Sequence, residues 1–311
     1  MKFSIITVCY NSEKCIEKTL KSVLSQTFMN YEYYIFDGGS TDRTLAILDD
    51  FQNSFNQKML YTSQTDQGIY NAMNKSLSCI TGDYVLFLNA DDYYSSDFLQ
   101  YLSTCINTNP ADVYFGDVIT YSTDDIQTIS TANLDYILTG MPMCHQGVAI
   151  KTSLFKNAQG FDETFKISAD WDLILRLYLQ GAVFYKYTEP KVFYALGGLS
   201  SSDIFQHEIK SIIDKNLAHP FNIDIEDFIN FLSKPYLLNE NTVKVILSKI
   251  YSSNNQVLKS VFIKNYVYLV LHNYSSFWKK TTTSKGYKIM SFLRSYRRLI
   301  DVVRIIIKPF S

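Results

Sequence analysis

The chain has 311 residues, of which 47% are hydrophobic and 15% aromatic, enough for one large α/β domain with an appendage or for two smaller domains. Its 12 glycines and 6 prolines are too few for long flexible linkers or for a disordered protein. The net charge of −1 is unevenly distributed along the chain: residues 1–200 carry −9 and residues 201–311 carry +8. This division suggests an acidic catalytic body and a basic tail with a different partner.

The cysteines and the start of the chain indicate a protein of the reducing cytosol. The five cysteines are scattered and form no CxxC pair, so neither a disulfide framework nor a zinc site is predicted. The first apolar run ends at residues 9–13 without a small-residue cleavage site, so no secretory signal is expected. No stretch reaches about 18 uninterrupted apolar residues, so a membrane-spanning helix is not expected either.

Strands and helices alternate along the first third of the sequence. A β-rich apolar run at residues 3–8 is followed by apolar residues at helical spacing over 16–24. The same patterns predict further strands at 31–36, about 58–62 and 84–88, and further helices at 45–51, 69–78 and about 97–106. This alternation predicts right-handed βαβ units and a parallel sheet with helices on both faces.

Three of the expected strands end in polar clusters, at residues 9–11, 37–42 and 89–92. Ligands of parallel sheets bind outside the carboxyl ends of the strands, so the three clusters are expected to line one site. The phosphate-binding patterns GxGxxG and GxxxxGK[ST] are absent from the sequence. Residues 37–42 taken alone are typical of a turn followed by a helix cap.

The cluster at the end of the strand 84–88 suits a hard divalent cation. Asp91 and Asp92 are adjacent carboxylates that repel each other, and Asn89 adds an amide oxygen. Mg²⁺ typically binds one or two carboxylates together with substrate phosphates, so these residues are interpreted as a platform for a metal and a diphosphate. The alternative is that Asp91 or Asp92 caps the helix expected at 97–106.

Seven segments, taken in order, resemble the inverting enzymes of glycosyltransferase family 2. They are SIITVCYN, FDGGSTDRT, SQTDQGIYNAMNKS, GDYVLFLNADD, HQGVAI, GFDETFKISADWDLILRL and GGLSS, which together cover about residues 3–202. The resemblance implies a GT-A fold, that is, a Rossmann-like and mostly parallel α/β sheet flanked by helices. The nucleotide-sugar half would span about 1–110 and the acceptor half about 111–214.

The resemblance also implies a nucleotide-sugar donor, in the first place a UDP-sugar, and a divalent metal, Mg²⁺ or Mn²⁺. The residues matching donor-binding positions are Thr7, Tyr10, Asp37, Asp66, Lys75, Asn89 and Asp91. Asp91 and Asp92 match the acids that contact the ribose and the metal, and His207 is a further candidate metal ligand. Asn89 stands where the family usually has an acid, which leaves open whether Asp91 or Asp92 binds the metal directly.

Inversion at a sugar carbon requires one general base on the face opposite the leaving group. Asp170 in SADWDLILRL matches the catalytic acid residue of the family, at the start of an expected helix. On the acceptor side, the resemblance suggests His145, Gln146, Trp171 and Asp172. Alternatives remain for several of these residues: Asp170 and Asp172 also suit the positive end of a helix, Trp171 a buried core position, and the two histidines local hydrogen bonding.

Residues 215–311 are expected to form a helical extension outside the resemblance. Residues 279–311 contain nine Lys and Arg, and apolar residues recur at spacings of three and four over 289–307. This pattern predicts a basic amphipathic helix, suited either to an anionic membrane surface or to packing on the body of the protein. No base-reading motif accompanies it, so nucleic acid is not an expected partner.

The sequence therefore predicts a glycosyltransferase that extends a lipid-linked saccharide in the synthesis of a surface polysaccharide such as an O-antigen. It would be cytoplasmic and peripheral, on the cytoplasmic face of the inner membrane. One alternative is a sugar-nucleotide pyrophosphorylase, although residues 9–13 lack the glycine-rich basic turn that such an enzyme needs. Another is a non-catalytic nucleotide-sugar-binding protein, although the carboxylates at 91, 92 and 170 are present.

Overall fold

The computed structural model describes residues 1–122, 127–196, 203–233, 240–252 and 259–260. These residues divide into two compact units. The first unit comprises Met1–Leu134 and Met141–Glu208, and the second comprises Asp135–Gly140 and the described residues that follow Glu208. The predicted boundary after residue 214 stays a prediction.

The first unit has an α/β architecture. Its strands are β1 (Phe3–Cys9), β2 (Tyr31–Asp37), β3 (Met59–Ser63), β4 (Tyr84–Phe87), β5 (Tyr93–Tyr94), β6 (Val113–Gly116), β7 (Val118–Tyr121), β8 (Gln127–Ser130), β9 (Ala149–Lys151), β10 (Phe184–Tyr187) and β11 (Val192–Ala195). Its helices are α1 (Ile16–Leu24), α2 (Thr44–Gln52), α3 (Ile69–Asn74), α4 (Phe98–Thr108), α5 (Thr152–Asn157), α6 (Ala169–Leu179) and the start of α7 (Asp203–Ile213). The strands and helices predicted for the first third of the chain are confirmed.

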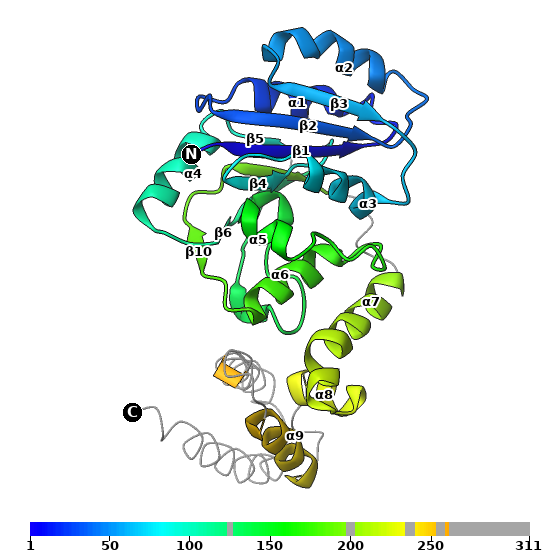
Figure 1. The fold of residues 1–311 in the computed structure, drawn as a ribbon, viewed down its shortest axis with the longest axis vertical. Helices are drawn as coiled ribbons and strands as arrows, with labels where there is room; N and C mark the ends of the chain where they lie inside the picture. The colour runs from blue at the N-terminus through cyan, green and yellow to red at the C-terminus, as the bar shows by residue number, and fades with distance from the viewer. Residues whose placement is uncertain (123–126, 197–202, 234–239, 253–258, 261–311) are drawn as a thin grey trace. The chain divides into compact units, whose positions relative to one another are not determined.

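A seven-stranded sheet with the order β10-β6-β9-β4-β1-β2-β3 forms the centre of this unit. Figure 1 shows β3, β2, β1 and β4 side by side, and all of their pairings are parallel. Strand β9 is antiparallel to both of its neighbours, whereas β6 and β10 pair in parallel. All seven residues of β1 are buried, as expected of a strand covered on both faces. The predicted GT-A-like, mostly parallel architecture is confirmed.

The helix α4 decides one of the alternatives left by the sequence. It begins at Phe98, and Asp97 occupies the N-cap position. Asp91 and Asp92 lie upstream of the short strand β5, so neither carboxylate caps this helix. The capping interpretation of the two acids is therefore wrong.

A second sheet with the order β5-β11-β7-β8 follows the polar end of β4. Its pairing of β5 with β11 is antiparallel, and the rings of Tyr93 and Phe193 stack with their centres 4.4 Å apart. This pairing brings the backbone N–H of Ala195 to the carboxylate of Asp92, at 2.8 Å from Oδ1. The second sheet thus fixes the loop that carries the two acids.

A buried carboxylate lies at the amino-terminal end of the central strands. Glu32 of β2 accepts hydrogen bonds from Lys2 Nζ, from Ser4 Oγ, from both the N–H and the hydroxyl of Thr81, and from Gly82 N–H. Position 82 requires glycine, because a Cβ there would lie 2.6 Å from the backbone nitrogen of Ser4. Burial alone would raise the pKa of Glu32, but these donors lower the pKa to about 2.

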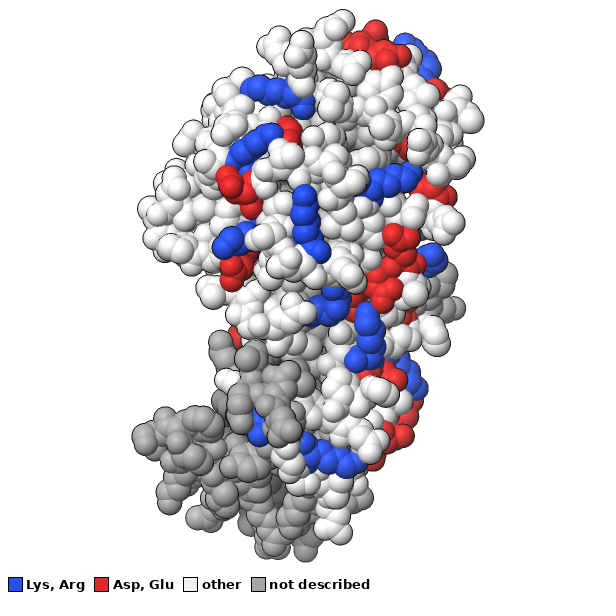
Figure 2. Space-filling view, in the orientation of Figure 1, with Lys and Arg blue, Asp and Glu red and all other residues white. Residues whose placement is uncertain are grey.

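Surface charge in the first unit is mixed on the face shown in Figure 2. Basic and acidic side chains are interspersed there, although the sequence from 1 to 200 is acidic overall.

The second unit is helical where the structure describes it. Beyond the shared helix α7 it contains a π-helical turn (Asp214–Ala218), a 3₁₀ turn (His219–Phe221), α8 (Ile225–Ser233) and α9 (Glu240–Ser252). Within the described residues, no helix is long and apolar enough to cross a membrane. The basic amphipathic helix predicted within 289–308 lies outside the described residues.

Candidate active site

The carboxyl ends of β1, β2 and β3 meet at one edge of the sheet, as their parallel pairing requires. Asp37, the last residue of β2, is buried and accepts hydrogen bonds from the N–H groups of Gly39 (3.0 Å) and Ser40 (2.9 Å) and from the hydroxyls of Ser40 and Ser63. Burial would raise the pKa of Asp37, but these hydrogen bonds outweigh it and lower the pKa. The carboxylate is therefore ionised and already engaged by the turn that follows it.

Two other loops approach this turn. Tyr10, which follows β1, is 63% exposed. A Cβ built on Gly38 would lie 2.8 Å from Oδ2 of Asp66 and 3.5 Å from Cβ of Tyr10. The absence of a side chain at position 38 thus allows Asp66 to approach the end of β2. Tyr10 and Asp66, both predicted to bind the donor, lie together at this edge.

Two other predicted donor residues have internal partners. The hydroxyls of Thr7 and Tyr33 lie 2.9 Å apart in a hydrogen bond, and the Thr7 side chain is fully buried. It offers no free atom to a nucleotide at the surface. The Nζ atom of Lys75, at the end of α3, lies 3.5 Å from the carbonyl oxygen of Gln64, so the lysine spans the segment that contains Asp66.

The metal candidates follow β4 and differ in burial. Asp92 is only 1% exposed, whereas the side chain of Asp91 is exposed. Burial raises the pKa of Asp92 to about 7, and the charge of Asp91 adds to the rise. Within the described part of the chain, neither Oδ2 of Asp92 nor Oδ1 of Asn89 has a hydrogen-bond partner, although both atoms are buried.

The unpartnered oxygens of Asn89 and Asp92 are suitable ligands for a divalent cation. Mg²⁺ and Mn²⁺ prefer carboxylate and carbonyl oxygens, and a cation beside Asp92 would offset the cost of burying its charge. However, the described residues contain no cluster of three or more His, Cys, Asp or Glu side chains able to hold a metal by themselves. His207, which is exposed on α7, does not join Asp91 and Asp92 in such a cluster. Further ligands would have to come from Asn89 or from a bound diphosphate.

Asp170 lies in the first turn of α6, where three residues contact its carboxylate. Its Oδ2 lies 3.3 Å from Nδ1 of His145, and its Oδ1 accepts from the N–H of Trp171 at 2.8 Å. The hydroxyl of Tyr70 lies 3.1 Å from the same Oδ1 and 2.7 Å from the carbonyl oxygen of Ile167. The Asp170 side chain keeps 16% of its surface exposed, so it is restrained and still accessible.

A single short turn connects this carboxylate with the metal candidates. His145 and Gln146 are consecutive residues of the 3₁₀ turn His145–Gly147. While His145 faces Asp170, the buried Gln146 lies close enough to Asp92 to lower the pKa of that carboxyl group. Nε2 of His145 and Nε2 of Gln146 are buried without a hydrogen-bond partner among the described residues. Two of the four acceptor-side predictions thus belong to one turn near both Asp170 and Asp92.

The other two acceptor-side candidates are core residues in this structure. Asp172 is fully buried and forms an ion pair with Arg176, one helical turn later, at 2.7 Å. The guanidinium of Arg176 also donates to the carbonyl oxygens of Ala158 and Gly160. Trp171 is buried in the same helix, which agrees with the core alternative considered for it. Residues adjacent in sequence to Asp170 point elsewhere because a helix turns about 100° per residue.

Tyr70 was not among the predicted site residues. It lies in α3, within the motif GIYNAMN, and its position in that quoted segment was the only signal in the sequence. Burial and the charge of Asp170 raise the pKa of Tyr70 well above the usual value, so the phenol stays protonated and acts as a donor. Its hydroxyl connects α3, which follows the donor segment, with the loop that precedes α6.

Comparison with known proteins identifies the family. The profile described as "Glycosyl transferase family 2" matches residues 4–157. A "PGL/p-HBAD biosynthesis glycosyltransferase" of Mycobacterium tuberculosis is 32% identical over 214 residues, which cover 68% of this chain and 83% of the relative. The chain belongs to glycosyltransferase family 2. The family resemblance noted in the sequence is confirmed, and the protein is a glycosyltransferase.

Solved structures of other glycosyltransferases share the fold of this family 2 member. S. aureus TarS 1-349 in complex with UDP-GlcNAc has a TM-score of 0.55 at 20% identity, covering 89% of this chain and 92% of TarS 1-349. The mannosyltransferase PcManGT of Pyrobaculum calidifontis, in complex with GDP-Man and Mn²⁺, has a TM-score of 0.53 at 13% identity, covering 99% of this chain and 87% of PcManGT. At these identities the likeness concerns the fold alone.

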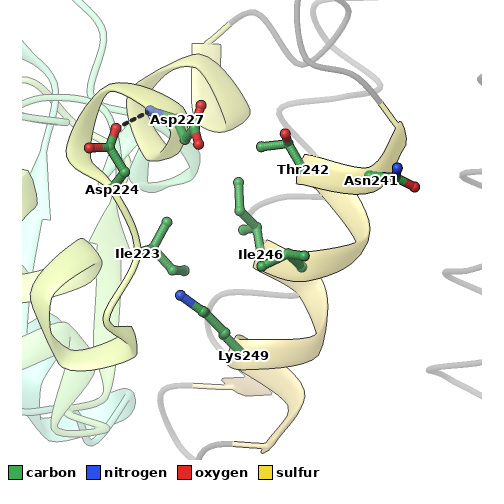
Figure 3. A pocket seen from close by; sticks show the side chains of 8 residues that line it. Ile223, Asp224, Asp227, Asn241, Thr242, Ile246 and Lys249 are labelled. Atoms are coloured by element: carbon green, nitrogen blue, oxygen red, sulfur yellow. Dashed lines mark hydrogen bonds between the residues drawn. The ribbon is translucent and has the colours of Figure 1, made fainter.

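The second unit of this family 2 glycosyltransferase contains a cavity of about 720 Å³. Figure 3 shows Ile223, Asp224 and Asp227 on one side and residues of α9, including Ile246 and Lys249, on the other. Lys249 donates to the carbonyl oxygen of Asn222. None of the predicted site residues lines this cavity.

Proposed function

We propose that this glycosyltransferase moves a sugar from a UDP-sugar to a hydroxyl of a saccharide acceptor with inversion at the transferred carbon. The observation that carries the proposal concerns the turn His145–Gly147. Its His145 lies 3.3 Å from the Asp170 carboxylate, and the turn also contacts β4, which leads to Asp92, and β11, which holds Asp92 through Ala195. A proton acceptor and a group suited to a metal-bound diphosphate thus belong to one site. This combination suits an inverting transferase that uses a metal.

Asp170 is the general base of the proposed reaction. The acceptor oxygen forms a bond to the anomeric carbon while the bond from that carbon to the diphosphate oxygen breaks, and the hydroxyl proton passes to a carboxylate oxygen of Asp170. The hydrogen bonds from Tyr70 and Trp171, together with the nearby ring of His145, fix the orientation of the carboxylate. Such preorganisation keeps the base in line with the reacting oxygen.

Asn89, Asp91 and Asp92 hold a divalent metal, Mg²⁺ or Mn²⁺, in this proposal. The bound metal supplies positive charge that stabilises the departing diphosphate. Two features support the assignment: the orphaned oxygens of Asn89 and Asp92, and the Mn²⁺ in a solved protein of the same fold. Asp92 combines burial with an unpartnered oxygen, so it is proposed as the more direct of the two acid ligands.

The nucleotide binds at the edge formed by Tyr10, Asp37 and Asp66, with Lys75 close to the same segment. The exposed ring of Tyr10 offers a face for stacking on the base, and Asp37 organises the turn beneath it. UDP is proposed as the nucleotide because TarS, a protein of this fold, binds UDP-GlcNAc. The GDP-Man bound by PcManGT makes guanine nucleotides the first comparison to test.

The proposed acceptor is a lipid-linked saccharide, reached from the cytoplasmic face of a membrane. Two observations support this part: a relative named for PGL/p-HBAD biosynthesis, and the basic, periodically apolar sequence at 289–308. In this proposal residues 1–214 form the catalytic domain and residues 215–311 a helical extension that associates with the membrane surface. The polysaccharide role, including O-antigen synthesis, belongs to the same proposal.

The decisive experiment is a transfer assay with purified full-length protein. UDP-sugars and GDP-mannose are incubated with a synthetic diphospho-lipid saccharide, or with the same saccharide lacking the lipid, in the presence of Mn²⁺ or of EDTA. Transfer from a UDP-sugar that requires metal and prefers the lipid acceptor, with inverted configuration in the product, is the expected result. Transfer with retained configuration, or transfer only from GDP-mannose, contradicts the proposal.

A further inference from the structure

A buried carboxylate on α7 holds the loop that leads to Asp170. Glu208 is nearly fully buried, and its two oxygens accept hydrogen bonds from three consecutive backbone N–H groups, those of Lys166, Ile167 (3.0 Å) and Ser168 (2.9 Å). In the part of the chain that the structure describes, no lysine or arginine forms an ion pair with Glu208. Backbone donors, and not a cation, therefore stabilise this charge.

These contacts fix the backbone that leads into α6. Ser168 occupies the N-cap position, but its side chain makes no capping hydrogen bond, and its buried hydroxyl has no partner within the described residues. Glu208, forty residues later in the chain, accepts from the N–H of Ser168 and of the two residues before it. A carboxylate at this place also interacts favourably with the positive end of the helix. The start of α6 is thus set by a residue of another helix.

The peptide of Ile167 is held from both sides. Its N–H donates to Glu208, and its carbonyl oxygen accepts from the hydroxyl of Tyr70 at 2.7 Å. The same Tyr70 hydroxyl reaches Oδ1 of Asp170. A shift of this peptide would therefore move both Asp170, three residues later, and one of the donors that orient its carboxylate.

We propose that Glu208 is a positioning residue for Asp170. This proposal rests on the proposed role of Asp170 as the general base. Glu208 does not contact the reacting atoms; it fixes the loop 166–168 and with it the first turn of α6. Glu208 is also the last residue of the first unit, and its helix α7 continues into the second unit.

The test compares Glu208→Gln with Glu32→Gln. Both substitutions remove a buried carboxylate that accepts several hydrogen bonds. Glu208 accepts only from backbone N–H groups, whereas Glu32 also accepts from side chains and lies at the amino-terminal end of the sheet, away from the strand ends that form the site. Each variant is measured for thermal unfolding, for UDP affinity, and for kcat and KM at a temperature well below unfolding. Glu208→Gln is expected to lower kcat by about 10- to 100-fold with unchanged UDP affinity, because small displacements of catalytic groups have effects of this size. Glu32→Gln is expected to lower stability and leave kcat unchanged.

A double variant separates this proposal from the proposed function. If Glu208 acts through Asp170, then Glu208→Gln has no further effect on kcat in an Asp170→Asn background. An Asp170→Asn variant that keeps full activity would overturn the role of Asp170 itself. An inactive Asp170→Asn together with a Glu208→Gln that keeps wild-type kcat would overturn only the positioning role.

A second substitution covers the case in which Glu208→Gln does not fold. Glu208→Asp keeps the charge and shortens the side chain by one methylene. A lowered kcat with native UDP affinity in this variant supports the proposal. An unchanged kcat, or a kcat that falls only in proportion to the unfolded fraction, overturns it.

Discussion

His145 and Asp170 face each other across the candidate active site, with Nδ1 of the imidazole 3.3 Å from Oδ2 of the carboxylate. The other ring nitrogen, Nε2, is buried and has no partner among the described residues. In the proposed function, one side of the ring orients the base and the other side contacts the acceptor.

Asp170→Asn should lower kcat by about 10²–10⁴, the usual range for the loss of a general base. The amide keeps the size of the side chain and can still accept from Trp171 N–H, so donor binding should survive. Single-turnover transfer and UDP titration measure the two effects separately. The matched control is Asp50→Asn, an exposed acid on α2, which should retain full activity. Loss of UDP binding in parallel with activity would show that Asp170 is a donor ligand or a structural residue instead.

His145→Ala should weaken acceptor use more than donor use. The substitution removes the ring that contacts Asp170 and with it the unpartnered Nε2, while the nucleotide edge at Tyr10 and Asp66 is untouched. We expect a lower kcat and a higher KM for the acceptor, with the UDP dissociation constant unchanged. Steady-state kinetics with each substrate varied in turn gives the comparison. A selective loss of UDP affinity would contradict the acceptor-side assignment.

Chelation should abolish transfer, and Mn²⁺ should raise the melting temperature of the wild-type protein in the presence of UDP. Asp92→Asn should lose most of this metal-dependent shift, because a carboxamide binds hard cations less strongly than a carboxylate. Without metal, the same variant should be at least as stable as the wild type at pH 8, since it no longer buries an unpaired charge. Differential scanning fluorimetry with EDTA, Mn²⁺ and UDP measures all three effects. Full activity in excess EDTA would refute the metal assignment.

The network around Glu32 predicts a specific pH dependence of stability. Its folded pKa of about 2 lies below the unfolded value of about 4.3, so its stabilising effect is fully present above about pH 5 and disappears as the pH falls towards 2. Glu32→Gln should lower the free energy of unfolding at pH 7 by an amount on the order of 3 kcal/mol, and this difference should shrink towards pH 2. Urea unfolding between pH 2 and 7 tests the prediction.

The control for this experiment is Glu17→Gln, which removes an exposed ion pair with Lys21 on α1. Surface pairs of this kind contribute about 0–1 kcal/mol, so the control should change stability little at any pH. Equal losses for the two variants would show that burial and hydrogen bonding do not distinguish Glu32.

The basic sequence near the end of the chain predicts salt-sensitive binding to anionic membranes. Replacing Arg294, Arg297, Arg298 and Arg304 by glutamine in the full-length protein should reduce sedimentation with anionic liposomes, since each basic residue near such a surface contributes about 1 kcal/mol. Transfer to a long-chain lipid acceptor should slow, and transfer to a short soluble acceptor should be nearly unchanged. Equal sedimentation of variant and wild type would favour a packing role for this segment.

The local sequence determined the elements and the edge of the sheet at which the site lies. Alternating apolar runs predicted the strands and helices from β1 to α4, because their periodicity reports which residues are buried. The polar ends of those strands then located the candidate site, since parallel strands gather their carboxyl ends at one edge. The ordered motifs identified the family and the candidate base.

Only the tertiary structure decided which of these side chains are free to act. Thr7, Trp171 and Asp172 looked suitable in the sequence, yet each is buried among internal partners. Tyr70 and Glu208 gave no separate signal, because their roles depend on hydrogen bonds to residues 97 and 40 positions away in the chain. The insertion of β9, antiparallel between β4 and β6, was equally invisible. Such contacts are fixed by how distant segments pack, and a periodicity read along the chain carries no information about them.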